Sequence, residues 1–137
     1  MEADELASWL LGEGRFLGMM KGRAVTAEQR RWHDLLVNEV GCIACRHDGR
    51  GVNTYCSIHH VDGRTKRHAH WYVLPLCGPH HQTGGEGVAL HHNKARFVAR
   101  YGTEADLLEE CAKILATDQH EIPAGFLAWL DGPEVMA

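Results

Sequence analysis

The stretch that decides the fold is CSIHHVDGRTKRHAHWYVLPLCGPHH, residues 56–81, which contains six histidines and two cysteines. The runs YCSIHHV and WYVLPLC are rich in β-branched and aromatic residues, a composition that favours β-strands. An Asp-Gly pair in the connecting DGRTKRHAH indicates a turn. We therefore predict a β-hairpin with a basic loop and many imidazole groups, which bind divalent metals and act as bases near neutral pH.

A structural zinc site is predicted from two short pairs of ligands. Cys42 and Cys45 form the CxxC of CIAC, and Cys77 and His80 form the CxxH of CGPH. Each spacing lets two side chains converge on one ion, and two such pairs complete a tetrahedral zinc site. The alternative is four buried or surface residues with accidental spacing. The odd total of five cysteines argues against a disulfide framework.

The charge of the chain is divided between its middle and its flanks. The net charge is −4, but residues 41–101 carry eight Lys or Arg, three Asp or Glu and nine of the eleven histidines. The middle therefore has a net charge of +5 and the flanks −9, and local charge decides whether a surface attracts phosphate. No run approaches the ~20 apolar residues of a membrane span. The acidic N-terminus resembles neither a secretory nor a transit signal, so we expect a cytoplasmic protein without a membrane partner.

Helices are predicted on both sides of the hairpin. Thr26 and Gln29 form a T-x-x-Q capping box, apolar residues follow at helical spacing, and Gly41 is a suitable C-cap. Further helices are predicted in NKARFVARYG, TEADLLEECAKILA and IPAGFLAWLDG. We expect Cys111 to lie in the core and Cys56 to be a packed cysteine of the first strand.

This order of elements predicts a single α+β domain preceded by an arm. Residues 1–25 hold a short apolar patch and frequent glycine, and we expect an arm or a short helix there. Residues 26–137 would form the domain, with a core at about 41–101 and helices after it. The length of 137 residues suffices for one modest hydrophobic core.

The adjacent histidines of the first strand are predicted to have different roles. Successive strand residues face opposite ways, so His59 and His60 cannot easily bind the same ion. This favours one histidine as a metal ligand and the other as a base. A metal with open positions holds a phosphate and stabilises a leaving oxygen, which makes phosphodiester hydrolysis a suitable reaction. The alternative is that both are surface residues of a zinc-stabilised hairpin.

The pattern CIAC…SIHHVDG…YVLPLCGPHHQ…H resembles the HNH, or ββα-metal, nuclease superfamily. It is most similar to the bacteriophage recombination-enhancement (Ref) nucleases, which act with host RecA filaments, over residues 41–108. The resemblance implies a small zinc-stabilised, treble-clef-like core with flanking helices. It further implies a metal-dependent DNA endonuclease whose partners are DNA and a RecA filament, in the cytoplasm of a bacterial host cell.

The resemblance also implies roles for individual histidines. His59 and His81 would be ligands of the catalytic metal, and His60 would be the general base that activates water. The third ligand would be His91, preferred over His92. The cofactors would be a structural Zn²⁺ and a catalytic divalent ion, Mg²⁺ with Mn²⁺ or Zn²⁺ as alternatives. The metal would contact a non-bridging phosphate oxygen and the leaving 3′ oxygen, so that cleavage leaves a 5′-phosphate.

Two positions depart from the common HNH pattern. Many members carry an Asn, which orients the base, where this chain has Tyr72. His68 or His70 is expected to take over that role, and the sequence leaves the choice open. The two later ligands commonly lie four residues apart, whereas His81 and His91 are ten apart. The intervening QTGGEGVAL must therefore loop out and return.

A phosphate-binding surface is predicted around the site. Arg64, Lys66 and Arg67 lie in the hairpin loop, and Lys94 and Arg96 lie in the following helix. Such cations bind backbone phosphates without distinguishing base sequence. The alternative is that they form a solvated, charged surface with no ligand.

Aromatic residues beside the loop could stack on bases. Of Trp71 and Tyr72, alternation along a strand buries at least one, and we predict that Trp71 is the core residue. The second function considered is a non-catalytic zinc module that binds DNA or a protein partner. A third is a zinc hydrolase acting on a small molecule. A complete set of base and ligands favours the nuclease.

Overall fold

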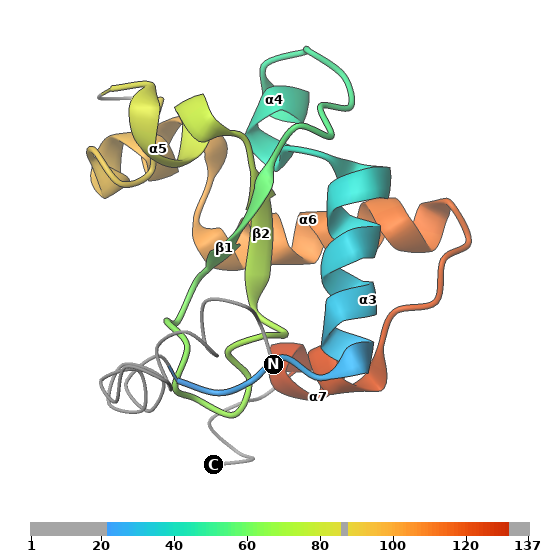
Figure 1. The fold of residues 1–137 in the computed structure, drawn as a ribbon. Coiled ribbons are helices and arrows are strands. Elements are labelled where there is room, and N and C mark those ends of the chain that lie inside the picture. The colour runs from blue at the N-terminus through green and yellow to red at the C-terminus, as the bar shows by residue number, and fades with distance from the viewer. Residues whose placement is uncertain (1–21, 86–87, 132–137) are drawn as a thin grey trace, which may run out of the picture.

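A two-stranded antiparallel hairpin lies at the centre of the protein (Figure 1). The computed structural model describes residues 22–85 and 88–131. Strand β1 spans Ser57–His60 and strand β2 spans Val73–Leu76, and Ser57 pairs with Leu76 and His60 with Val73. The predicted hairpin is therefore present, with strands shorter than the runs that predicted them. The basic connection occupies the residues between them.

The helix before the hairpin has the predicted caps. Helix α3 spans Ala27–Leu35, and Thr26 and Gln29 form both hydrogen bonds of a capping box. The helix continues as a π-helical turn, η1, at Leu36–Val40. Gly41 ends it with φ of 69°, and a Cβ there would lie 2.8 Å from the backbone of Asn53. Glycine is therefore required where the chain turns toward the cysteines.

Short elements carry the ligand pairs, and longer helices follow them. Helix α4 spans Ile43–His47, and the π-helical turn η2 spans Pro79–Thr83. Helices α5, α6 and α7 span Lys94–Tyr101, Glu104–Thr117 and Ala124–Asp131. Asn93 is the N-cap of α5. The histidine pair at 91–92 therefore lies before this helix and not in it.

The hydrophobic core forms around β2. All four residues of β2 are buried, and both α6 and η1 contact this strand. Figure 1 shows α6 crossing behind the hairpin while α3 runs beside it. The largest buried side chains include Trp32, Leu36, Val40, Ile43, Leu74, Leu76, Phe97, Leu107, Leu115 and Phe126. The hairpin is thus anchored through β2, whereas β1 is only partly covered.

Three sequence predictions concern the edge of this core. Cys111 is buried as predicted, and Cys56 is half-buried and packs against the core just before β1. Trp71 and Tyr72 are both half-buried. The prediction that strand alternation makes Trp71 the core residue of the two is therefore wrong, because both residues precede β2 and both pack, partly buried, against the core. Trp71 lies in the turn before β2 and packs over Gly125 of α7, where a Cβ would collide with the indole ring.

The last residues of the predicted N-terminal arm lie against the hairpin loop. Arg23 N–H donates to the carbonyl of Arg64 at 2.8 Å, and Arg23 Nε donates to the carbonyl of Thr65 at 3.0 Å. The first 21 residues of that arm lie outside the described residues. Within residues 22–85 and 88–131, no helix has both the length and the apolar character needed to cross a bilayer.

Candidate active site and metal centres

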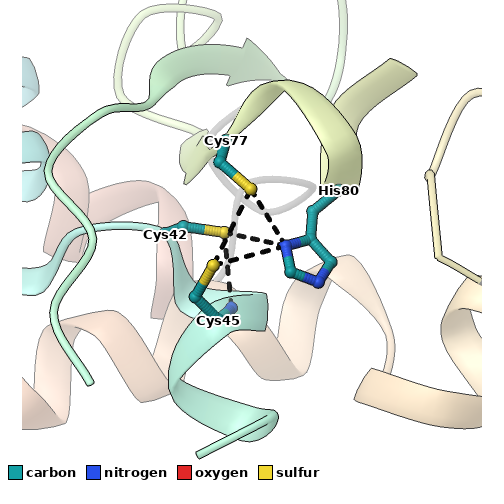
Figure 2. A group of neighbouring side chains, drawn as sticks. All are labelled: Cys42, Cys45, Cys77 and His80. Atoms are coloured by element: carbon teal, nitrogen blue, oxygen red, sulfur yellow. Dashed lines mark hydrogen bonds between the residues drawn. The ribbon is translucent and has the colours of Figure 1, made fainter. Parts of the chain in front are cut away.

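Three thiols and one imidazole converge between α4 and the end of β2 (Figure 2). The ligand atoms of Cys42, Cys45, Cys77 and His80 all lie within 4.8 Å of one another. The Sγ atoms of Cys45 and Cys77 are 3.7 Å apart. With a Zn–S bond of about 2.3 Å, a zinc tetrahedron has edges of about 3.8 Å. The cluster therefore fits a structural zinc ion.

Local structure aims these side chains at one point. Cys42 caps α4, and the N–H of Cys45 donates to its Sγ at 3.4 Å. Asn53 Nδ2 lies 3.5 Å from Cys45 Sγ. Burial raises the pKa of the Cys42 and Cys77 thiols. Buried thiolates need a cation, so the donor set fits a metal better than it fits an empty core.

The carboxylate of Asp48 contacts the ring nitrogen of His80 that faces away from the sulfurs. His80 Nδ1 points to the sulfurs, and its Nε2 lies 3.0 Å from Asp48 Oδ2. Asp48 also accepts hydrogen bonds from the Tyr101 hydroxyl, at 2.9 Å, and from Arg100, at 3.2 Å. Burial acts to raise the pKa of Asp48, but the hydrogen bonds from Tyr101 and His80 lower it overall. Such a partner sets the tautomer of a ligating histidine.

A second cluster contains the three histidines predicted to hold the catalytic metal. His81 Nε2 lies 3.2 Å from His59 Nδ1 and 2.8 Å from His91 Nε2. His91 belongs to this cluster and His92 does not. Backbone hydrogen bonds explain the ten-residue spacing, because His91 N–H donates to the carbonyl of His81 and Leu90 N–H to that of His80. The looped segment thus returns to the point where it began.

A buried carboxylate holds this cluster too. His59 Nε2 lies 2.7 Å from Glu104 Oε2, and Lys94 Nζ lies 2.8 Å from Glu104 Oε1. Burial acts to raise the pKa of Glu104, but the hydrogen bonds from His59 and Lys94 lower it overall. Burial, with the adjacent His59 and His91, lowers the pKa of His81 to about 4. His81 is therefore neutral near pH 7, the form that binds metals.

His60 lies on the other side of the same strand. Its Nε2 is 3.0 Å from His70 Nδ1, and its buried Nδ1 has no hydrogen-bond partner among the described residues. Burial, with the positive charge of Arg64, lowers the pKa of His60 to about 3. His68 instead pairs with Asp62, at 2.6 Å. Of the two histidines considered as orienting residues, His70 is thus the one in contact with His60.

A surface pocket of about 470 Å³ joins the two sides of β1. Its lining comprises Ile58, His59, His60, Gly63, Arg64, Thr65, His81 and His91. It therefore combines the histidine cluster, the candidate base and one cation of the hairpin loop. A pocket of about 550 Å³ lies elsewhere, between α3 and the segment leading into α7, and none of the candidate site residues lines it.

The predicted phosphate-binding residues fall into two groups. Arg64, Lys66 and Arg67 are exposed in the hairpin loop. Lys94 is also exposed, but its ammonium group is paired with Glu104, so it supports the histidine cluster. Arg96 is exposed on α5. Three of the five predicted cations are therefore exposed together in the hairpin loop, and the other two lie on α5.

Sequence reasoning missed the carboxylates Asp48 and Glu104. Glu104 occupies the first turn of α6, where an acidic residue is already explained by the helix dipole. Asp48 lies in a turn after α4, where such residues are common. Glu104 is buried and Asp48 is half-buried, and only the folded structure shows their contacts with His59 and His80.

Fold and site together define a small α+β protein with two clusters of side chains that could each hold a metal ion. One cluster has four ligands, as structural zinc sites have, and the other has three, which leaves positions for water or substrate. A family model described as recombination enhancement, RecA-dependent nuclease matches residues 25–116. The chain belongs to this family, as the sequence resemblance predicted. Its class of activity is therefore that of a nuclease, and the family's function involves DNA and RecA.

Proposed function

We propose that the protein is an HNH-type, metal-dependent DNA endonuclease that hydrolyses phosphodiester bonds, with a nuclease domain at residues 26–137. One observation carries this proposal. The histidine cluster and His60 lie on opposite sides of β1 and line one pocket, and His60 Nδ1 has no hydrogen-bond partner within residues 22–85 and 88–131. A module that only binds DNA has no need of this combination.

His59, His81 and His91 would hold the catalytic cation through Nδ1, Nε2 and Nε2, respectively. A bound divalent cation supplies a Lewis acid for a phosphate oxygen and for the leaving 3′ oxygen. Mg²⁺ remains the predicted ion by family resemblance. Imidazole donors suit Zn²⁺ better than Mg²⁺, so Mg²⁺, Mn²⁺ and Zn²⁺ all belong in an assay.

His60 would accept the proton of the attacking water through Nδ1, because its Nε2 is already bonded to His70. Its lowered pKa keeps this nitrogen unprotonated near pH 7. A bound phosphate would raise the pKa of the imidazole, because a nearby negative charge favours its protonated form. Substrate binding would thus strengthen the base when it is needed.

The zinc cluster would keep the catalytic cluster in place. His80 belongs to the first and the adjacent His81 belongs to the second, both in the η2 turn. Holding one residue of a tight turn restricts its neighbour. The zinc cluster therefore supports the reaction without taking part in it.

The RecA filament would bring the nuclease to the DNA that it cleaves. The flanks of the chain have a net charge of −9, which disfavours tight binding of those parts to free DNA. Weak intrinsic affinity would suit a bacteriophage enzyme that acts on RecA-coated DNA in recombination, in the cytoplasm of a bacterial host cell.

The test of this function is a nicking assay on supercoiled and on single-stranded DNA. It compares Mg²⁺, Mn²⁺ and Zn²⁺, each with and without a RecA–nucleotide filament. We expect metal-dependent cutting that leaves 5′-phosphate ends and that the filament stimulates. Cutting that is equally fast without the filament would contradict the dependence on RecA but not the nuclease activity. No cutting under any condition would contradict the nuclease and favour the non-catalytic zinc module.

The hairpin loop should determine DNA affinity. Each phosphate contact contributes about −0.9 to the slope of log K against log salt concentration. We expect Lys66→Ala to reduce this slope by about 1 and the triple replacement of Arg64, Lys66 and Arg67 by about 3. Fluorescence anisotropy of labelled DNA over a series of salt concentrations measures this slope.

Lys113→Ala is the matched control, because it removes the same charge from helix α6, where Lys113 pairs with Glu109. We expect its slope to equal that of the wild type. An equal loss in the Lys66 and Lys113 variants would show a non-specific charge effect and would contradict a phosphate-binding loop.

A further inference from the structure

We propose that His70 is a positioning residue that fixes His60 with a free Nδ1, and that the backbone of Arg23 fixes His70 in turn. This inference rests on the proposed role of His60 as the general base. It means that the segment just before the residues matched by the family model completes the proposed active site.

The argument starts at a backbone carbonyl, which can only accept hydrogen bonds. His70 Nε2 lies 2.7 Å from the carbonyl oxygen of Arg23, so this nitrogen must carry the proton. In a neutral imidazole the other nitrogen is then an acceptor. His70 Nδ1 therefore accepts, and its partner 3.0 Å away, His60 Nε2, must donate.

The same reasoning assigns the remaining nitrogen of His60. Because its proton sits on Nε2, its Nδ1 carries a lone pair. That atom is buried and has no hydrogen-bond partner among the described residues. The chain of contacts from Arg23 through His70 to His60 thus sets which nitrogen is available to take a proton.

Two further contacts hold His70 and Arg23 in this series of hydrogen bonds. His70 is 2% exposed, and His33 of α3 lies 2.7 Å from its carbonyl oxygen. The Arg23 backbone is held by the carbonyl of Arg64 in the hairpin loop. Its neighbour Gly22 has φ of 90°, and a Cβ there would collide with that same carbonyl. Glycine is what allows the segment to dock so closely.

The direct test is ring-nitrogen NMR of the zinc-loaded full-length protein, with the His60 signals assigned by their loss in His60→Ala. We expect a single Nε2–H tautomer of His60 in the wild type. His70→Leu removes the acceptor, and we expect this preference to be lost. His70→Asn keeps an oxygen near the position of Nδ1, and we expect the preference to be retained.

Cleavage kinetics give the second readout. We expect His70→Leu to lower kcat by about 10- to 100-fold with KM unchanged, which is part of the contribution of a general base. We expect His70→Asn to recover most of this loss. Gly22→Ala should also lower kcat, whereas Gly51→Ala should not, because Gly51 has a similar φ of 75° but open space around it.

The outcomes separate this inference from the proposed function. An unchanged His60 tautomer in His70→Leu, or a His70→Asn that behaves like His70→Leu, overturns the role of His70. Normal cleavage by Gly22→Ala overturns the role of the N-terminal segment. A wild type that never cuts contradicts the nuclease, yet the tautomer measurement still decides whether His70 sets the state of His60.

Discussion

Replacing His60 with alanine is expected to reduce the rate of DNA cleavage by about 10²–10⁴-fold, the usual contribution of a general base. The reason is His60 Nδ1, which has no hydrogen-bond partner in the described part of the chain and is thus the proposed proton acceptor. His59, His81 and His91 each direct one ring nitrogen into the candidate metal cluster, and Arg64 cannot accept a proton at neutral pH. Single-turnover nicking of supercoiled DNA measures the loss.

The matched control is His92→Ala, which removes an exposed histidine that lies outside the cluster. We expect it to cut at the wild-type rate. We also expect His60→Ala to keep its zinc content and its affinity for DNA, because His60 belongs to neither metal cluster. If His60→Ala cuts as well as the wild type under the same conditions, His60 is not the base and the proposed mechanism fails.

Removing the structural zinc is expected to have the largest effect on stability. Structural zinc contributes roughly 10–16 kcal/mol in zinc-finger peptides, which is more than the whole stability of most small domains. Here the cluster joins α4 to the end of β2, and its four ligands are buried. We therefore expect Cys77→Ser, or a strong chelator, to unfold the domain. Circular dichroism during heating and zinc analysis measure this.

Cys56→Ser is the matched control for this experiment, because Cys56 is a half-buried cysteine outside the cluster. We expect it to retain one structural zinc and to unfold near the wild-type temperature. A chelator that leaves the melting curve unchanged would contradict a structural role for the ion. Loss of cleavage should accompany unfolding, because His80 and His81 are adjacent in one turn.

Much of the site follows from local sequence alone. The CxxC and CxxH spacings place two ligands on each side of one ion, and the structure brings these four together. Strand alternation sends His59 and His60 to opposite sides of β1, as expected. The caps at Thr26 and Thr103 likewise depend on residues only three positions away. These features depend on short-range geometry, which the sequence carries directly.

The partners of the histidines were decided by tertiary structure. His80 meets Asp48 and His59 meets Glu104 across separations of 32 and 45 residues. The choice of His91 over His92 depends on how a glycine-containing loop returns to the η2 turn. These pairings require α4 and α6 to pack against β2 and the segment before α5 to return to η2. No local pattern encodes that packing.

The identity of the residue that orients His60, His68 or His70, was also left open by the sequence and decided by the tertiary structure. Both lie in the basic connection and are equally suited to orient His60 by sequence. His68 pairs with Asp62 of its own loop, whereas His70 is buried and anchored to Arg23, 47 residues earlier. The sequence by itself determined which residues could act as ligands and base. Only the folded packing decided which hydrogen bond each one makes, because a buried imidazole takes the partner that long-range contacts bring to it.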